Sequence, residues 1–150
     1  TMYGQDSPDS EDFVVSWLAT VTRAATERDT DAELPFAVVT RIAGVDDPDS
    51  GSSEDSVQVE WFDRGASAAS FTARRGHRRM MLLAREHTDV TLSDDTVASV
   101  DYLKTSMRPT RMPYADEQII RYVARYRIGL SFVDSYLSPQ KATPVDVTGG

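Results

Sequence analysis

The feature that most constrains this chain of 150 residues is an alternation near its C-terminus. Between residues 120 and 132, apolar and aromatic side chains hold the even positions, whereas arginine, glycine and serine hold most of the odd ones. Successive side chains of a β-strand point to opposite faces of a sheet, so this period of two predicts a strand. The even positions are expected to face the core: Ile120, Tyr122, Ala124, Tyr126, Ile128, Leu130 and Phe132.

Two helices are predicted from apolar residues at three-to-four spacing. Ser10 is the expected N-cap of the first, which should continue to about Glu27. The second spans Ala66 to about Glu86. Gly76 would weaken that helix by about 1 kcal/mol relative to alanine, which indicates either a close packing contact or a kink. The expected buried face comprises Ala69, Ala73, Gly76, Met80 and Leu83.

Three further strands are predicted from β-branched and alternating residues, at 36–43, 57–62 and 96–107. The first two should form a hairpin around a long loop at 44–56, which is almost wholly turn formers and acids. Residues 109–116 contain two prolines and are expected to be a connection.

The predicted fold class is therefore α+β: a mostly antiparallel four-stranded sheet with two helices packed on one face, in the order α-β-β-α-β-β. The domain itself should span residues 10–132. A flexible N-terminal arm is expected at 1–9 and an extended C-terminal arm at 133–150, since both are polar and rich in proline or glycine.

Charge and composition restrict the function classes. The formal net charge of −8 argues against a general affinity for nucleic-acid phosphates. The chain has no cysteine, and its apolar runs are far shorter than the roughly 18–20 residues that cross a bilayer, so we expect no membrane association. The N-terminal residues also lack the pattern of a secretory signal.

No constellation of catalytic residues is apparent, so we expect no enzymatic activity and no cofactor. The only histidines are His77 and His87, and His77 lies among arginines that should oppose its protonation. The acidic segment 46–54 offers oxygen ligands, but it lacks the spacing of a calcium-binding loop. We therefore predict a solvated loop without metal.

Two groups of arginines are candidates for binding. The run at 74–79 could contact phosphates, although its charges lie within a helical pattern and no stacking aromatics accompany it, so a solvated or subunit-pairing face is favoured. Arg121, Arg125 and Arg127 share the outward face of the last strand. Their mutual repulsion requires acids from a neighbouring element or subunit, unless that face is simply solvated.

Several segments, in order, resemble the tail terminator proteins of long-tailed (siphovirus-type) phages of actinobacteria. The resemblance is carried by LPFAVVTRIAGVDD at 34–47, DSVQVEWF at 55–62, the alanine-rich helix from Ala66, PTRMPYAD at 109–116 and RYVARYR at 121–127. It covers about residues 10–132 and departs from the family in the arginine-dense stretch and the C-terminal arm.

The resemblance implies a structural virion protein of the phage neck. Such a protein forms a homohexameric ring at the head-proximal end of the tail tube, stops tube polymerisation and joins the tail to the head-tail connector or stopper protein. Genomic DNA would pass through the ring without specific binding. Head-to-tail rings need two different patches on each subunit. The candidate interface residues are Arg41, Asp46, Asp47, Asp49, Arg74, Arg75, Arg78, Arg79, Arg111, Tyr114, Asp116, Arg121, Arg125 and Arg127.

Three alternatives stay open on sequence grounds. Another neck protein, such as the stopper, would share these local patterns. A DNA-binding accessory protein would use the arginines at 74–79 and should bind DNA with steep salt dependence. A small α+β enzyme is disfavoured because no acid, base and nucleophile converge in the sequence.

Overall fold

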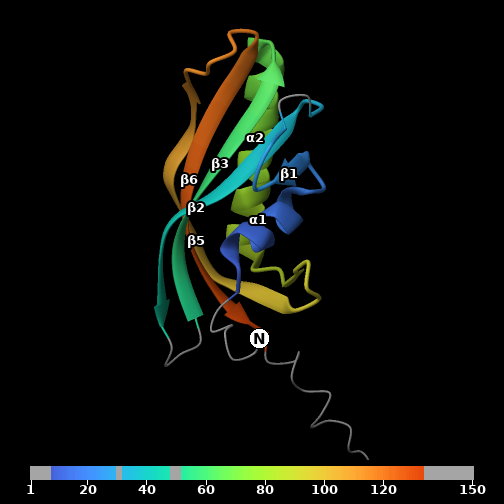
Figure 1. Cartoon of the computed structure of the whole chain (residues 1–150). Coiled ribbons are helices and arrows are strands. Elements are labelled where there is room, and N and C mark those ends of the chain that lie inside the picture. The colour runs from blue at the N-terminus through green and yellow to red at the C-terminus, as the bar shows by residue number, and fades with distance from the viewer. Residues whose placement is uncertain (1–7, 30–31, 48–51, 134–150) are drawn as a thin grey trace, which may run out of the picture.

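The structure is a computed structural model that describes residues 8–29, 32–47 and 52–133 (Figure 1). Both predicted arms lie outside the described residues, except for Pro8, Asp9 and Val133. The helices are α1 (Ser10–Leu18) and α2 (Ala66–Glu86). The strands are β1 (Arg23–Ala25), β2 (Phe36–Asp47), β3 (Ser52–Arg64), β4 (Val90–Thr91), β5 (Val97–Met112) and β6 (Ile119–Phe132).

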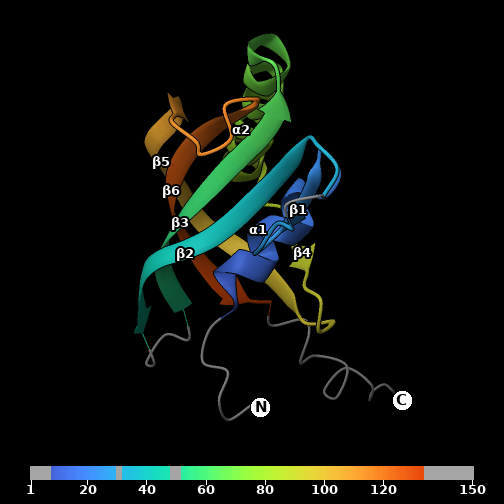
Figure 2. The same ribbon diagram turned by 45° about the horizontal axis from the view of Figure 1, so that its top comes forward.

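The fold is α+β with two helices, but the prediction of a four-stranded, mostly antiparallel sheet is wrong. The sheet has six strands in the order β1-β2-β3-β6-β5-β4, and it is mixed because β1 pairs with β2 in parallel. It is strongly curled, and both helices lie against the same face (Figures 1 and 2). Strands β1 and β4 contain only three and two residues, too few to produce a recognisable period in the sequence.

The β2–β3 hairpin is longer than predicted. Residues 44–47 and 52–56 belong to paired strands rather than to a loop of thirteen residues. Strand β3 is central: while β2 pairs on one side of it, Ser52–Ser56 pair on the other with Ser131–Arg127 of β6. These backbone hydrogen bonds outweigh the weak strand propensity of serine and aspartate. A prediction from the local sequence depends on that propensity and therefore misses the strand.

Helix α1 is shorter than predicted and is capped by a different residue. Its N-cap is Asp9, whose side chain accepts hydrogen bonds from the backbone N–H groups of Glu11 and Asp12. The helix ends at Leu18 instead of continuing to Glu27. The β-branched Thr20, Val21 and Thr22 follow, and the chain then forms β1.

Helix α2 has the predicted bounds and covers the concave face of the sheet. Its expected face is buried, and Gly76 marks a close contact with β3: a Cβ atom at that position would lie 2.4 Å from Nε1 of Trp61. Trp61 is fully buried at the centre of the core. The core also includes Ala124, Tyr126, Ile128 and Leu130, which confirms the predicted inward positions in the middle of β6.

The two-proline connection at 109–116 is only partly a connection. Strand β5 continues through Pro109 to Met112, and the turn to β6 begins afterwards. Proline lacks an N–H donor, so it is tolerated here because β5 is paired along this stretch on one side only. The pairing of β5 with β6 also shifts register at three places.

Candidate interaction surface

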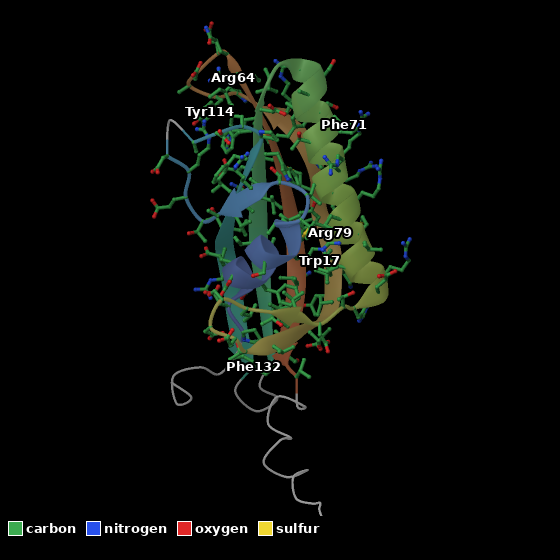
Figure 3. All side chains as sticks on the ribbon, turned by 90° about the vertical axis from the view of Figure 1, so that its right-hand side faces the viewer. Trp17, Arg64, Phe71, Arg79, Tyr114 and Phe132 are labelled. Carbon is green, nitrogen blue, oxygen red and sulfur yellow. The ribbon has the colours of Figure 1, made fainter. Side chains whose placement is uncertain are left out.

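The arginines of α2 divide into two groups with different surroundings. Arg79 is half-buried and holds α1 against α2: its guanidinium carbon lies 3.5 Å from the ring centroid of Trp17, and its Nε donates to the Trp17 carbonyl at 3.0 Å. In return, the indole N–H of Trp17 donates to the Arg79 carbonyl at 2.8 Å. Arg79 was predicted to belong to the exposed arginine run at 74–79, but it packs against Trp17 inside the molecule (Figure 3).

The remaining α2 arginines face solvent. Arg74, Arg75, Arg78 and Arg85 are exposed, and none forms an ion pair with any carboxylate in the described part of the chain. Phe71 is 55 % exposed, and the guanidinium carbon of Arg75 lies 5.6 Å from the centroid of its ring. Phe71 was not predicted as a surface residue, because periodicity alone does not distinguish an exposed aromatic side chain from a buried one.

A shallow depression of about 380 Å³ adjoins these arginines. Apolar atoms of Val21, Met81 and Leu82 line it, and Arg75, Arg78 and Arg85 form its basic rim. A surface of this composition suits an acidic partner that also offers apolar groups.

The arginines of β6 are satisfied within the chain. Arg121 Nε donates to Glu60 Oε2 at 2.7 Å, Arg125 Nε donates to Gln58 Oε1 at 3.0 Å, and Arg127 forms an ion pair with Glu54. All three partners belong to β3. The neighbouring strand, one of the two sources expected from the sequence, thus supplies acids to Arg121 and Arg127, whereas Arg125 meets the neutral amide of Gln58.

The Arg121–Glu60 pair should contribute more to stability than the exposed pair Arg23–Glu33. Its side chains are 26 % and 16 % exposed, compared with 56 % and 74 % for Arg23 and Glu33. We expect Glu60→Gln to lower the free energy of unfolding by about 0.5–1 kcal/mol and the control Glu33→Gln to leave it nearly unchanged. Urea denaturation measures both; equal losses would contradict the assignment.

The other candidates are scattered over the fold. Arg41 and Arg111 are exposed on β2 and β5, and the Arg41 backbone N–H donates to Glu11 Oε2 at 2.7 Å. In the β5–β6 turn, Tyr114 packs on Phe62 with ring centroids 5.1 Å apart, while Asp116 Oδ1 accepts from the Gln118 backbone N–H. The turn also borders a depression of about 400 Å³.

The predicted acidic candidates lie at the end of the β2–β3 hairpin. Asp46 and Asp47 pair through their backbones with Ser53 and Ser52. Asp49 lies outside the described residues. Across the described ranges, no group of three or more histidines and acids is arranged to hold a metal ion. Nor is either described helix long and apolar enough to cross a membrane.

His77 forms a polar contact beneath α2. Its Nδ1 lies 2.7 Å from the hydroxyl oxygen of the fully buried Tyr126. Burial, and secondarily the positive charge of Arg108, lower the pKa of His77 below its ordinary value of 6.5. Burial also raises the pKa of Tyr126, so its hydroxyl stays protonated. The lowered pKa of His77 agrees in direction with the expectation from the sequence, but its main cause is desolvation rather than neighbouring positive charge.

Acid should weaken the fold through His77. The unfolded chain binds this proton near pH 6.5, whereas the folded chain binds it only at lower pH. The free energy of unfolding should therefore fall as the pH drops below about 6.5, until the folded-state pKa is passed. We expect His77→Gln to flatten this slope between about pH 7 and pH 5 in urea titrations, whereas the exposed-site control His87→Gln should keep it. If the free energy of unfolding of His77→Gln depended on pH as steeply as that of the natural chain, His77 would not be the source of the acid sensitivity.

No protein-family model matches this sequence, and a search of curated proteins finds no significant match.

Proposed function

We propose that this chain is a structural subunit of a phage neck, a tail terminator that forms a hexameric ring on the head-proximal end of the tail tube. The ring stops tube polymerisation and joins the tail to the head-tail connector or stopper protein, while genomic DNA passes through without specific binding. The identity of the assembly rests on the resemblance of the segments at 34–47, 55–62, 109–116 and 121–127 to that family.

The observation that best supports self-assembly is that the sheet ends in two long, dissimilar strand edges. Strand β1 covers only Phe36–Val38 of β2, and β4 covers only Val97 and Ala98 of β5. Within the described residues, the outer sides of 39–47 and 99–112 have no strand partner. The first edge belongs to the β2–β3 hairpin, and the second contains Pro109. A closed head-to-tail ring needs two such different flanks on every subunit.

The test is to mix the purified chain with the polymerising tail tube protein of the same phage and to image the products by electron microscopy. We expect six-subunit rings on one end of each tube and shorter tubes as the chain concentration rises. Tubes that grow to the same length with both ends bare would refute the proposal. A ring found between the connector and the terminator position in the virion would instead identify a stopper.

The second candidate is a DNA-binding accessory protein, because Arg74, Arg75, Arg78 and Arg85 lack carboxylate partners among the described residues. If about four arginines bind phosphates, the logarithm of the association constant for DNA should fall with the logarithm of the salt concentration at a slope of roughly −4. Absence of DNA binding near physiological salt would eliminate this candidate.

A further inference from the structure

The outward side of α2 carries arginines that nothing within the chain neutralises. We define the α2 basic stripe as Phe71, Arg74, Arg75 and Arg78, which are all exposed and follow one another at helical spacing. None of the three guanidinium groups pairs with a carboxylate in the described part of the chain. The sequence also contains no acidic residue from Ala66 to Arg85, whereas ordinary surface helices intersperse both signs of charge. The stripe is therefore suited to a partner that supplies carboxylates.

The segments around α1 and β4 have the opposite charge. No lysine or arginine occurs at 9–22, which contains α1, or at 86–103, which contains β4 and the start of β5. The two segments are joined because Asp12 Oδ2 accepts hydrogen bonds from the backbone N–H and the hydroxyl group of Ser93, at 3.1 and 2.5 Å. We define the acidic patch by its aspartates: Asp9, Asp12, Asp89, Asp94 and Asp95.

Part of the acidic patch is free to bind another molecule. Asp89 and Asp95 are exposed, and their side chains form no hydrogen bond or ion pair with any residue that the structure describes. Asp94 is exposed as well, and hydrogen bonds from Thr96 lower the pKa of its carboxyl group, which keeps it charged. Asp9 caps α1 and Asp12 holds Ser93, so these two add negative charge without leaving their places.

The basic stripe and the acidic patch face different sides of the molecule. The two helices lie side by side against the sheet, with Trp17 packed on Arg79 between them. In Figure 3, α1 and the β4–β5 turn lie to the left of α2, whereas Phe71 lies on the right-hand side of α2. Two basic stripes cannot bind each other, because their arginines would meet and repel. The complementary surface for the stripe is thus the acidic patch of another copy.

We propose that the α2 basic stripe of one copy binds the acidic patch of a second copy. The inference rests on the proposed function in that it names the contact through which the ring subunits join. Asp89 and Asp95 supply carboxylates to the guanidinium groups of the stripe. The Phe71 ring and the depression of about 380 Å³ beside Arg75 and Arg78 surround these pairs with apolar atoms, which strengthens their attraction. The contact is heterologous, so each copy uses one surface of each kind and the series can close into a ring.

Site-specific cross-linking tests the contact, since the natural chain has no cysteine. Ala68→Cys places a thiol on an exposed position of α2, one turn before Phe71. Thr91→Cys places one on an exposed position of β4, between Asp89 and Asp94. Mixing the two single variants with a short bismaleimide should give a linked heterodimer.

Two controls accompany the cross-linking. Ser106→Cys, on an exposed position of β5, should not cross-link with Ala68→Cys. Ala68→Cys alone should give no homodimer, because two basic stripes repel each other. The proposal is overturned if Ala68→Cys cross-links equally well with Ser106→Cys or with itself, or if it gives no cross-link with Thr91→Cys at high protein concentration.

Charge reversal shows whether the arginines and aspartates carry the contact. We expect Arg74→Glu/Arg78→Glu in the Ala68→Cys copy to lower the cross-linking yield at least about tenfold at low salt. Adding Asp89→Arg/Asp95→Arg to the Thr91→Cys copy should restore the yield, because the signs are again opposite.

A matched reversal separates this contact from the effect of net charge. Lys104→Glu/Arg111→Glu in the Ala68→Cys copy changes the same number of charges at exposed positions on β5 and should have little effect. Circular dichroism confirms that each variant is folded. If the folded swapped pair does not recover the yield, or if the β5 reversal lowers it as much, the contact is wrong.

Two results separate this inference from the proposed function. If the chain caps tail tubes and Arg74→Glu/Arg78→Glu caps them equally well, the contact is wrong while the terminator function holds. If the swapped pair cross-links as expected but tubes are never capped, the contact holds and the terminator function is wrong. Should duplex DNA bind the α2 basic stripe and Arg74→Glu/Arg78→Glu abolish only that binding, with cross-linking unchanged, the stripe serves DNA and the proposal fails.

Discussion

Replacing Gly76 with alanine is expected to lower the free energy of unfolding by about 1–2 kcal/mol, although the same change normally stabilises a helix by about 1 kcal/mol. The new Cβ would lie 2.4, 2.5 and 2.6 Å from Nε1, Cε2 and Cζ2 of Trp61. Those atoms belong to a fully buried ring that cannot move aside without displacing the core. Overpacking a core in this way costs about 1–3 kcal/mol, because side chains and backbone must shift to relieve so short a contact. The steric cost therefore outweighs the helix propensity.

A double-mutant cycle with Trp61→Phe isolates this contact. Phenylalanine removes the indole nitrogen and one fused ring, which leaves room for the alanine methyl group. We expect the double variant to be more stable than the sum of the two single losses predicts, by about 1 kcal/mol or more. Urea denaturation followed by circular dichroism provides the measurement. Ser67→Ala, on an exposed position of α2, is the control for helix propensity and should be neutral or slightly stabilising. If the two losses of stability were strictly additive, the Trp61 ring would not be the reason for glycine at position 76.

Replacing Arg79 with alanine is expected to destabilise the fold by about 2–3 kcal/mol. The side chain contributes a charged hydrogen bond to the Trp17 carbonyl, worth about 1.5–3 kcal/mol, and a cation–π contact with the same residue, worth about 0.5–2 kcal/mol. Helix α1 has only nine residues, so it depends on tertiary contacts rather than on its own hydrogen bonds. Loss of the Arg79 side chain should release α1 first.

The neighbouring Arg78 gives a matched control. It carries the same side chain on the same helix but is exposed, and Arg78→Ala should change stability by less than about 0.5 kcal/mol. Arg79→Lys keeps the charge but loses the planar group and the Nε donor, so an intermediate loss is expected. Hydrogen exchange should show faster amide exchange in residues 10–18 of Arg79→Ala. Equal stabilities of the two alanine variants would contradict the role of Arg79.

Long periodic segments were predictable from the sequence, and elements defined by pairing were not. The alternation of β6 and the face of α2 from Ala69 to Leu83 each repeat often enough to identify a structure. Strands β1 and β4 are too short to repeat at all. The segment at 44–56 looks like a loop because serine, glycine and aspartate favour turns. Much of it is strand because 44–47 pair with 52–55 and because 52–56 also pair with Arg127–Ser131 of β6.

The candidate surface was predictable only in outline for the same reason. The arginine run at 74–79 is visible in the sequence, but the assignment of Arg79 to Trp17 spans 62 positions and depends on how the two helices cross. The pairing of Arg121 with Glu60 likewise depends on the register between β3 and β6, which no local pattern specifies. Phe71 was missed because nothing in its spacing distinguishes it from a core residue.

The irregular pairing of β5 has a consequence for how copies of this chain can associate. An open strand edge usually invites another chain to add its backbone hydrogen bonds, and the product is a sheet that grows without limit. Here three register shifts and Pro109 interrupt the edge, so an incoming strand finds no continuous row of donors and acceptors. A contact made through this edge would then depend on side chains, which salt and single charge substitutions can adjust. Such a contact is reversible and finite, as the proposed ring with its fixed number of subunits requires.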